Sequence, residues 1–210
     1  MWVNNLQKTL SENRWFYIPY LIFLALAAVI QLNYTQFEIS LQVNSWHNLP
    51  LDYLFFYLTH VGDGLFGAAL CILFLLFNKK HFWPSVFSFY TPAIITQLLK
   101  HLVFSGHLRP SALMTNYPQL HFVQGVTMHT QNSFPSGHTT SAFAVFLFFA
   151  LISTNKKLGF IYLLIAILIG LSRIYLLQHF FQDVIAGSIV AVICVTFIYT
   201  IINTKRAAQQ

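Results

Sequence analysis

Three short segments of this 210-residue chain contain residue types that can bind and transfer a phosphoryl group. Phosphoryl transfer needs fixed positive charge, a nucleophile, and an acid that protonates the leaving oxygen. Together the segments supply three cations, two histidines and one carboxylate. In chain order they are Lys100 with Arg109-Pro110, then Pro135-Ser136-Gly137-His138, and then Ser172-Arg173 with His179 and Asp183. These residue types predict a site for a phosphate.

The third segment pairs a histidine with an acid. His179 and Asp183 are four residues apart, and this spacing places both on one face of a helix. The carboxylate can then accept a hydrogen bond from one ring nitrogen of His179, which leaves the other nitrogen free to act as a nucleophile or a base. A polar pair that only ties two helices together is the alternative.

The second segment leads directly into an apolar stretch and is expected to start a helix. Ser136 can cap that helix, and Gly137 lets the backbone approach a ligand closely. The free N–H groups at a helix N-terminus favour an anion, and His138 would lie on the first turn beside it. A capping turn with an uninvolved histidine is the alternative.

The three cations have a functional and a structural interpretation. The planar guanidinium of Arg173 matches phosphate oxygens in a bidentate way, which a lysine cannot do. Lys100 and Arg109 would add positive charge, and Pro110 stiffens the turn that follows Arg109. The structural alternative for all three is a long side chain that reaches from the membrane to the headgroups.

The composition indicates a membrane protein. Hydrophobic residues make up 57% of the chain and charged residues only 8%, whereas a soluble domain has about 25% charged residues. The net charge of +6 does not indicate nucleic-acid binding, because the basic residues occur in scattered pairs and not on one contiguous face. Cys71 and Cys194 lie in apolar runs and are expected to be small buried hydrophobes without a disulfide.

Six apolar stretches have about the length that crosses a bilayer. Gly62-Asp63-Gly64 interrupts the second, and residues 51–59 before it can form a short helix at the interface. We therefore expect an all-α fold, a bundle of six transmembrane helices that forms a single domain over residues 1–210. The predicted spans are 16–34, 54–77, 83–104, 138–154, 158–176 and 180–202.

The eight remaining cations predict the orientation of the spans. Short cytoplasmic loops carry an excess of Lys and Arg, and these eight fall before the first span or after the second, fourth and sixth. They are Lys8, Arg14, Lys79, Lys80, Lys156, Lys157, Lys205 and Arg206. We therefore expect both termini in the cytoplasm, and Lys100, Arg109 and Arg173 at the outer face. Residues 1–31 have the basic start of a signal peptide, but the apolar run continues without a cleavage site, so an uncleaved first helix is expected.

The three segments resemble the signature of the type 2 phosphatidic acid phosphatase (PAP2) family, the membrane branch of a superfamily that also contains vanadium haloperoxidases. The second and third segments match the family pattern residue for residue. The first segment departs from it, because eight residues separate Lys100 from Arg109 and the usual interval in the family is shorter. In its organisation, the resemblance covers about residues 60–210.

The resemblance implies a role for each of these residues. His179 would be the nucleophile that forms a phosphohistidine, Asp183 would orient it, and His138 would protonate the leaving group and later activate water. The phosphate would be held by Lys100, Arg109, Ser136, Gly137 and Arg173. The family needs neither a metal nor another cofactor, because the fixed cations take that role. From the residues alone either histidine can attack, although the pairing with Asp183 favours His179.

The expected function is that of an integral membrane lipid phosphatase in the bacterial cytoplasmic (inner) membrane, with its active site at the outer, periplasmic face. Its partners would be the bilayer and a lipid phosphate, such as phosphatidic acid, phosphatidylglycerophosphate, undecaprenyl diphosphate or phosphorylated lipid A. Phosphotransfer to another lipid is the nearest alternative. A lipid-phosphate transporter would need cations along a path through the bilayer, and vanadate-dependent haloperoxidases are typically soluble. The sequence leaves the substrate and the oligomeric state open.

Other polar residues near the three segments have weaker assignments. His60 and Asp63 in the second span can support the site or cap a helix. The loop 111–134 is suited to cover an acyl or prenyl chain. Four histidines crowd the outer face, and because no spacing on one helix makes them metal ligands, they are expected to contact solvent or substrate. They are His101, His107, His121 and His129.

Overall fold

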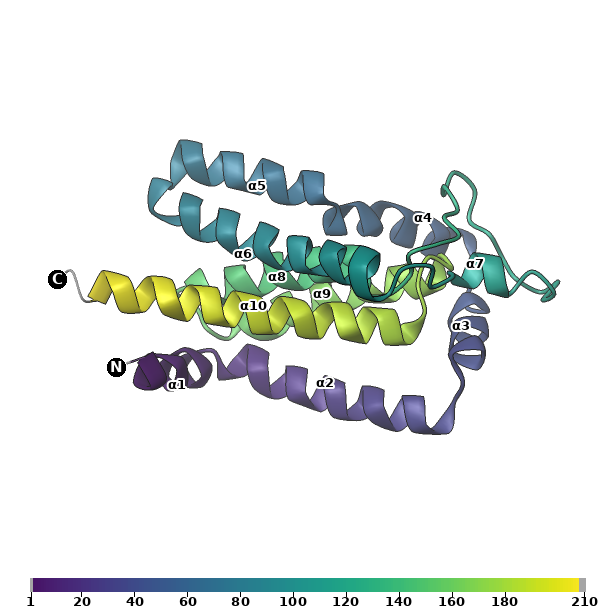
Figure 1. Cartoon of the computed structure of the whole chain (residues 1–210), viewed down its shortest axis with the longest axis horizontal. Helices are drawn as coiled ribbons and strands as arrows, with labels where there is room; N and C mark the ends of the chain where they lie inside the picture. Colours follow the sequence, from purple (N-terminus) through teal and green to yellow (C-terminus); the bar gives the residue numbers. More distant parts are fainter. Residues whose placement is uncertain (1, 208–210) are drawn as a thin grey trace.

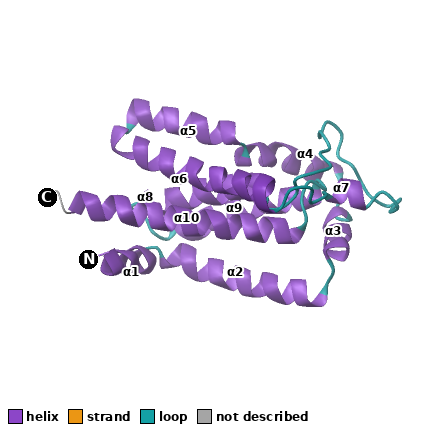
Figure 2. Ribbon diagram, viewed as in Figure 1, coloured by secondary structure: helices purple, strands orange, loops and turns teal. Residues whose placement is uncertain are grey.

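The computed structural model describes residues 2–207, and this part of the chain consists of helices and loops without a strand (Figures 1 and 2). The long helices run roughly along one axis, and α3 lies across one end of the bundle (Figure 1). The predicted domain of residues 1–210 includes Met1 and residues 208–210, which lie outside the described part. The helices are α1 (Trp2–Glu12), α2 (Arg14–Asn33), α3 (Gln36–Asn44), α4 (Leu49–Leu58), α5 (Gly64–Phe77), α6 (Lys79–Leu98), α7 (Pro110–Leu113), α8 (Gly137–Ile152), α9 (Leu158–Tyr175) and α10 (Phe181–Ala207).

Helix α8 forms the centre of the hydrophobic core. Phe143 and Leu147 are fully buried, and the helix packs against α6, α9 and α10. A helix that is apolar on all sides is stable when other helices or lipid chains surround it. Cys71 on α5 is buried in this core, as the sequence predicts, whereas Cys194 on α10 is only partly buried, and both are free thiols. Burial of α8 fixes its position, and with it the position of its N-terminus.

The outer helices expose large apolar side chains. Leu21, Leu26 and Leu32 on α2, and Leu65 and Phe77 on α5, are all more than half exposed. Apolar surface of this extent is unfavourable in water and favourable against lipid chains. The outside of the bundle therefore suits a bilayer.

Three helical segments of the described chain are long and apolar enough to cross a bilayer, and a fourth crossing results if α4 and α5 count as one span. The three are Arg14–Asn33, Leu158–Tyr175 and Phe181–Lys205. The predicted spans at 83–104 and 138–154 correspond to α6 and α8, which are not among them. Helix α8 has 16 residues, and α6 begins with Lys-Lys-His and contains two prolines. The all-helical class is confirmed, and the number of six spans stays a prediction.

The second predicted span is broken where the sequence predicts an interruption. Helix α4 ends at Leu58 and continues as a 3₁₀ turn over Thr59–Gly62, and α5 then leaves at an angle of 57°. A Cβ atom at Gly62 would lie 2.8 Å from the carbonyl oxygen of His138, which is closer than Cβ atoms come in real structures. Glycine at this position therefore lets the bend pack directly against the start of α8.

Helices α1 and α3 were not predicted from the sequence. Helix α3 begins at a capping box, in which Thr35 Oγ1 accepts from the Glu38 N–H at 3.2 Å and Glu38 Oε2 accepts from the Thr35 N–H at 2.7 Å. Helix α1 packs against the end of α10, where Asn5 Nδ2 donates to Thr204 Oγ1 at 2.8 Å. Both helices are too short to span a bilayer, so a search for spans of about 20 residues passes over them. The Thr-x-x-Glu pattern was the available signal for α3.

The three segments with predicted chemistry meet at one end of the bundle. The end of α6 and the junction of α9 and α10 lie opposite the two chain termini (Figure 1). The start of α8 touches the start of α10, because the Ser136 N–H donates to the Asp183 carbonyl oxygen at 2.9 Å. A Cβ atom at Gly187 would lie 2.5 Å from the Ser136 carbonyl oxygen, so glycine on α10 is required for this close approach. Backbone packing thus brings the second and third segments together.

Candidate active site

The three segments meet at a cavity of about 560 Å³ at this end of the bundle, and the bend between α4 and α5 and part of the loop 111–134 also line it. Lys100, Arg109 and Arg173 line it, although only 6%, 8% and 5% of their surfaces are exposed. Buried cations are costly unless they are paired, and one anion in the cavity would pair with all three. The other lining residues from the three segments are Gly137, His138, Gln178 and His179, whereas Ser136 and Asp183 do not line the cavity.

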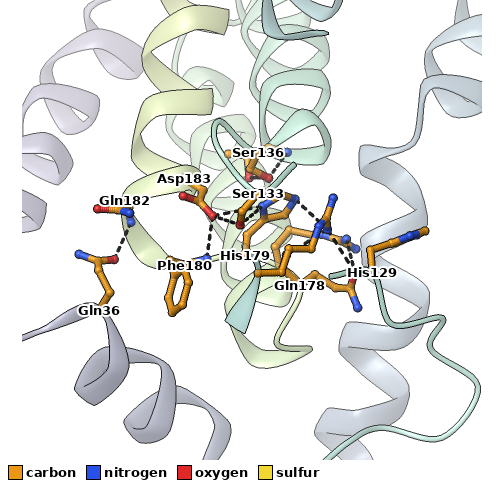
Figure 3. A network of polar contacts seen from close by, with 12 residues as sticks. Gln36, His129, Ser133, Ser136, Gln178, His179, Phe180, Gln182 and Asp183 are labelled. Carbon is orange, nitrogen blue, oxygen red and sulfur yellow. Dashed lines mark hydrogen bonds and ion pairs between the residues drawn. The ribbon is translucent and has the colours of Figure 1, made fainter. Parts of the chain in front are cut away.

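His179 and Asp183 are in contact, but the geometry differs from the predicted one. Helix α9 ends at Tyr175 and α10 begins at Phe181, so His179 lies in the turn before α10 and not on a shared helix face. Leu177 has a φ of +54°, a left-handed conformation typical of tight chain reversals. Asp183 reaches back from the first turn of α10, and its Oδ2 lies 3.3 Å from His179 Nδ1 (Figure 3). The turn, and not helix periodicity, forms the pair.

Ser133 holds the Asp183 carboxylate in place and was not predicted as a site residue from the sequence. Its Oγ donates to Asp183 Oδ2 at 2.5 Å and lies 3.5 Å from His179 Nδ1. The Phe180 N–H donates to the same carboxylate oxygen at 3.0 Å (Figure 3). Three groups therefore surround one oxygen of Asp183. The only sequence signal for Ser133 was its place shortly before Ser136.

The contact with Asp183 determines which nitrogen of His179 can react. A carboxylate accepts a hydrogen bond, so Nδ1 carries the hydrogen and Nε2 keeps its lone pair. Nε2 lies 3.4 Å from Arg109 Nη1, on the side of the cations. Burial, together with the charges of Arg109 and Arg173, lowers the pKa of His179 well below its ordinary value. The imidazole is therefore neutral at neutral pH, with a nucleophilic nitrogen that faces the cations.

Each arginine is held by hydrogen bonds to other parts of the chain. Arg109 Nε donates to the Gln131 carbonyl oxygen at 2.9 Å, and its Nη1 donates to the Gln178 carbonyl oxygen at 3.0 Å. Arg173 Nη1 donates to Thr59 Oγ1 at 2.5 Å, so the bend after α4 positions this guanidinium. Arg173 Nε is buried and has no hydrogen-bond partner within the described residues. Because a buried donor without a partner is costly, this N–H suits an anion in the cavity.

Gln178 connects the two guanidinium groups and is a second site residue that was not predicted from the sequence. Its Oε1 accepts from Arg109 Nη1 at 3.3 Å and from Arg173 Nη2 at 3.5 Å. Its Nε2 donates to the Thr127 carbonyl oxygen at 3.3 Å, which ties the arginines to the loop that lines the cavity. Gln178 therefore positions both guanidinium groups. Its place directly before His179 was the only signal in the sequence.

Lys100 reaches the cavity from a π-helical turn. Residues Leu99–Val103 form this turn at the end of α6, and the Phe104 N–H donates to the Leu99 carbonyl oxygen at 2.8 Å. Turns of this kind are rare and often occur at functional sites. A π-helical turn contains more residues than an α-helical turn. It therefore accommodates the long interval between Lys100 and Arg109, and both side chains still line the cavity.

Ser136 caps α8, as the sequence predicts. Its Oγ accepts from the Thr139 N–H at 3.4 Å and from Thr139 Oγ1 at 2.9 Å. His138 lines the cavity from the first turn of the helix. A Cβ atom at Gly137 would meet no atom closer than Gln97 Nε2 at 3.9 Å, so there is room beside this backbone for a ligand.

The four histidines of the outer face lie in different surroundings. His121 Nε2 lies 2.7 Å from Asp52 Oδ2, and its ring stacks on His47 with a centroid distance of 4.3 Å. Within residues 2–207, no three His, Cys, Asp or Glu side chains are grouped as metal ligands would be. His129 lines the cavity, where burial and the nearby cations lower its pKa. His129 is the one of the four that is placed to contact a ligand in this cavity.

Fold and site together define a class of protein. The chain is a helical membrane protein with a cavity at one end of its bundle. The cavity presents buried cations to a neutral histidine whose other nitrogen contacts a carboxylate. Such an arrangement can bind a phosphate group and accept it on the histidine.

Comparison with known proteins identifies the family. The sequence model of the PAP2 superfamily matches residues 81–207, which is more than half of the chain, and the chain therefore belongs to this superfamily. All three segments lie within the matched range. The resemblance seen in their residues is thereby confirmed.

Three similar proteins show how far the relationship extends. The chain is 28% identical to undecaprenyl-diphosphatase BcrC of Bacillus subtilis over 180 residues, which span 80% of this chain and 82% of that protein. Its structure resembles that of the transmembrane PAP2-type phosphatidylglycerolphosphate phosphatase of Bacillus subtilis, with a TM-score of 0.62 and 25% identity over 89% of this chain and 94% of the other. It also resembles Aquifex aeolicus LpxE, with a TM-score of 0.65 and 27% identity over 77% of this chain and 93% of the other. The similarity thus includes most of the fold.

Proposed function

We propose that this chain is an integral membrane lipid phosphatase that works through a phosphohistidine intermediate. Nε2 of His179 attacks the terminal phosphorus as the bond to the leaving oxygen breaks, and His138 gives that oxygen a proton. A water molecule then attacks the phosphohistidine, and His138 takes one of its protons. Inorganic phosphate leaves, and His179 returns to its neutral form.

One observation carries this proposal, the position of His179 between Asp183 and the buried cations. Nδ1 lies 3.3 Å from Asp183 Oδ2, so Nε2 is the nitrogen that faces the cavity. During transfer the imidazole becomes positively charged, and Asp183 would stabilise that charge as the acid of a catalytic triad does. A histidine with only a structural role has no need of three cations beside its free nitrogen.

The phosphate would be held by the cations and by the start of α8. The guanidinium groups of Arg109 and Arg173 can bind its oxygens directly, and Lys100 adds a third positive charge. The N-terminus of α8 contributes partial positive charge from its N–H groups. Fixed charges stabilise the transition state without reorganisation. The proposed phosphate-binding residues are Lys100, Arg109, Ser136, Gly137 and Arg173.

The proposed substrate class is a lipid phosphate or diphosphate in the same bilayer as the enzyme. The apolar outer surface of the bundle supports this class, since it keeps the enzyme among lipids. The names of similar proteins support it as well, because they include an undecaprenyl-diphosphatase and a phosphatidylglycerolphosphate phosphatase. The candidate substrates are phosphatidic acid, phosphatidylglycerophosphate, undecaprenyl diphosphate and phosphorylated lipid A.

A panel of these lipids in detergent tests the function. The purified protein should release inorganic phosphate from at least one of them, and His179→Ala should abolish that release. His107→Ala is the matched control, because His107 is an exposed histidine near the site and outside the set that lines the cavity. Normal turnover by His179→Ala would overturn the mechanism. Labelled phosphate that appears in a second lipid and not in water would show phosphotransfer.

We propose in addition that the chain forms one domain with six spans in a bacterial cytoplasmic membrane. Helices α6 and α8 would be the two further spans, and both termini would lie in the cytoplasm with the cavity at the outer face. The eight cations outside the cavity support this orientation, since basic residues are enriched in short cytoplasmic loops.

Cysteine labelling tests the orientation. Asn116 and Asn155 are exposed loop residues on the two predicted sides of the membrane. In intact cells, a membrane-impermeant maleimide should label Asn116→Cys, whereas Asn155→Cys should react only after the membrane is permeabilised. The reverse pattern would contradict the orientation.

A further inference from the structure

The proposed mechanism requires His138 to hold a proton next to several positive charges. Before the first step this histidine must be protonated, because it supplies the proton for the leaving oxygen. Arg173, Lys100 and Arg109 line the same cavity as His138, and their positive charges disfavour a further positive charge there. A negative charge close to its ring would offset their effect.

Asp63 provides a negative charge at this place. Its Oδ1 lies 3.6 Å from His138 Nε2, and the two side chains are 44% and 30% exposed. This distance is within ion-pair range and slightly longer than a hydrogen bond. The contact depends on the bend between α4 and α5, since the absence of a side chain at Gly62 lets that bend pack against the His138 backbone. The broken helix therefore carries a carboxylate to the second histidine of the site.

His60 lies on the far side of the same carboxylate. Its Nδ1 is 3.7 Å from Asp63 Oδ2, and its side chain is 60% exposed. The two oxygens of Asp63 thus face different histidines, and both histidines line the cavity, His60 with the larger exposed fraction. The charged and titratable groups that face His138 are His60, Asp63, Lys100, Arg109, Arg173 and His179.

From this geometry, and on the basis of the proposed function, we infer that Asp63 is a positioning residue that orients His138 and stabilises its protonated form. With Nε2 directed to Asp63, the Nδ1–H of the imidazolium is the donor to the leaving oxygen. That proton moves to the oxygen as the phosphorus–oxygen bond breaks. In the second step Nδ1 takes a proton from the attacking water, and Nε2 keeps its hydrogen throughout.

The inference predicts that the importance of Asp63 depends on the leaving group. An alkoxide leaves poorly without a proton, whereas a nitrophenolate leaves without one. For Asp63→Asn, kcat/KM should fall about tenfold with phosphatidic acid, a part of the 10²–10⁴-fold that general acid catalysis contributes. With para-nitrophenyl phosphate it should change less than about twofold, because kcat/KM includes only the steps up to release of the leaving group.

The pH profile gives an independent readout. A negative charge close to a histidine favours its protonated form, so Asp63→Asn should move the basic limb of the kcat/KM profile to lower pH. Asp63→Glu keeps the charge and should leave the limb near its original position. If Asp63→Asn does not fold, as judged by gel filtration in detergent, Asp63→Ser removes the same charge with a smaller side chain.

The controls separate this role from a structural one. Glu12→Gln removes an exposed acid on α1 that pairs with Lys8 at 3.9 Å and should change neither readout. In a His138→Ala background, Asp63→Asn should cause no further loss, since its effect acts through that histidine. Equal losses with both substrates and an unmoved basic limb would overturn the inference. Failure of the parent protein to hydrolyse any lipid phosphate would instead overturn the proposed function.

Discussion

His179 and His138, the two cavity histidines with proposed catalytic roles, are each paired with an acid, and the two pairs have different surroundings. His179 and Asp183 are 3.3 Å apart, and both side chains are only 1% exposed. His138 and Asp63 are 3.6 Å apart and 30% and 44% exposed. Ser133 and a backbone N–H fix Asp183, whereas the bend of a broken helix carries Asp63.

The difference matches two chemical tasks. A nucleophile must stay neutral and hold one orientation, and both conditions follow from burial and several hydrogen bonds. A group that gives and takes protons needs a less rigid setting and access to water, which the second pair has. The same two residue types thus serve one reaction in two ways because their exposure to water differs.

Replacement of Asp183, the buried acid, should reduce catalysis more than any other change at the two pairs. Asp183→Ala removes the acceptor of the His179 Nδ1–H and the negative charge that stabilises the imidazolium formed during transfer. We expect kcat to fall about 10³-fold or more, against about tenfold for Asp63→Asn. Steady-state kinetics of both variants with one lipid substrate measure the ratio. Equal losses would show that the two pairs do not differ in role.

The second largest effect is expected from a change at Arg173, which is proposed to bind the phosphate that His179 attacks. Arg173→Lys keeps the charge but loses the fork that contacts Thr59 and presents the unpaired Nε to the cavity. We expect kcat/KM to fall about 10²-fold. Thr59→Val removes only the acceptor of Nη1 and should cost less. Activity of Arg173→Lys close to that of the parent protein would show that Arg173 acts as a point charge.

A change at Ser133 tests how far catalysis depends on the fixed orientation of Asp183 and His179. Ser133→Ala removes the 2.5 Å hydrogen bond to Asp183 and leaves the other two contacts of that oxygen. We expect kcat to fall about tenfold, because the carboxylate loses one of its orienting donors but keeps its charge. Ser133→Thr keeps the hydroxyl and is the matched control. No loss in Ser133→Ala would mean that Phe180 N–H and His179 suffice to orient the acid.

The smallest expected effect concerns the acid limb of the pH profile of kcat/KM, which reports the protonation of His179. Burial, with Arg109 and Arg173, lowers the pKa of His179, so the nucleophile stays deprotonated as the pH falls through the ordinary histidine range. The acid limb of kcat/KM should therefore have its midpoint below about pH 6.5. Because the phosphate of the substrate also ionises, its ionisation is measured separately and the kcat/KM profile is corrected for it. If the midpoint of the corrected acid limb lies at or above about pH 6.5, His179 is not held neutral by burial.

The sequence predicts the parts of the site that depend on neighbouring residues. Ser136 caps α8 because the capping residue and the helix that it starts are adjacent in the chain. The break at Gly62 to Gly64 was predictable for the same reason. The contact between His179 and Asp183 was also predicted, but on a helix face, and the turn before α10 forms it instead.

Residues whose contacts depend on tertiary packing could not be predicted in this way. Ser133 reaches Asp183 across 50 positions of the chain, and no local pattern marks that pairing. Gly187 matters only because the α8 backbone approaches α10 at that point. Helix α3 is a different case, since its Thr35 and Glu38 form a recognisable capping box that a search for long apolar spans does not use.

The most direct test of the central claim is to trap the phosphoryl group on His179. His138→Ala with para-nitrophenyl phosphate should complete the first step, because the leaving group needs no acid, and should stall at the second, because no base activates water. After an alkaline quench, which phosphohistidine survives, mass spectrometry of the digested protein locates the phosphate. We predict nearly one phosphate per chain on His179 and none in the His138→Ala, His179→Ala double variant. A phosphate on another residue, or turnover without any phosphorylated His179, would contradict the account.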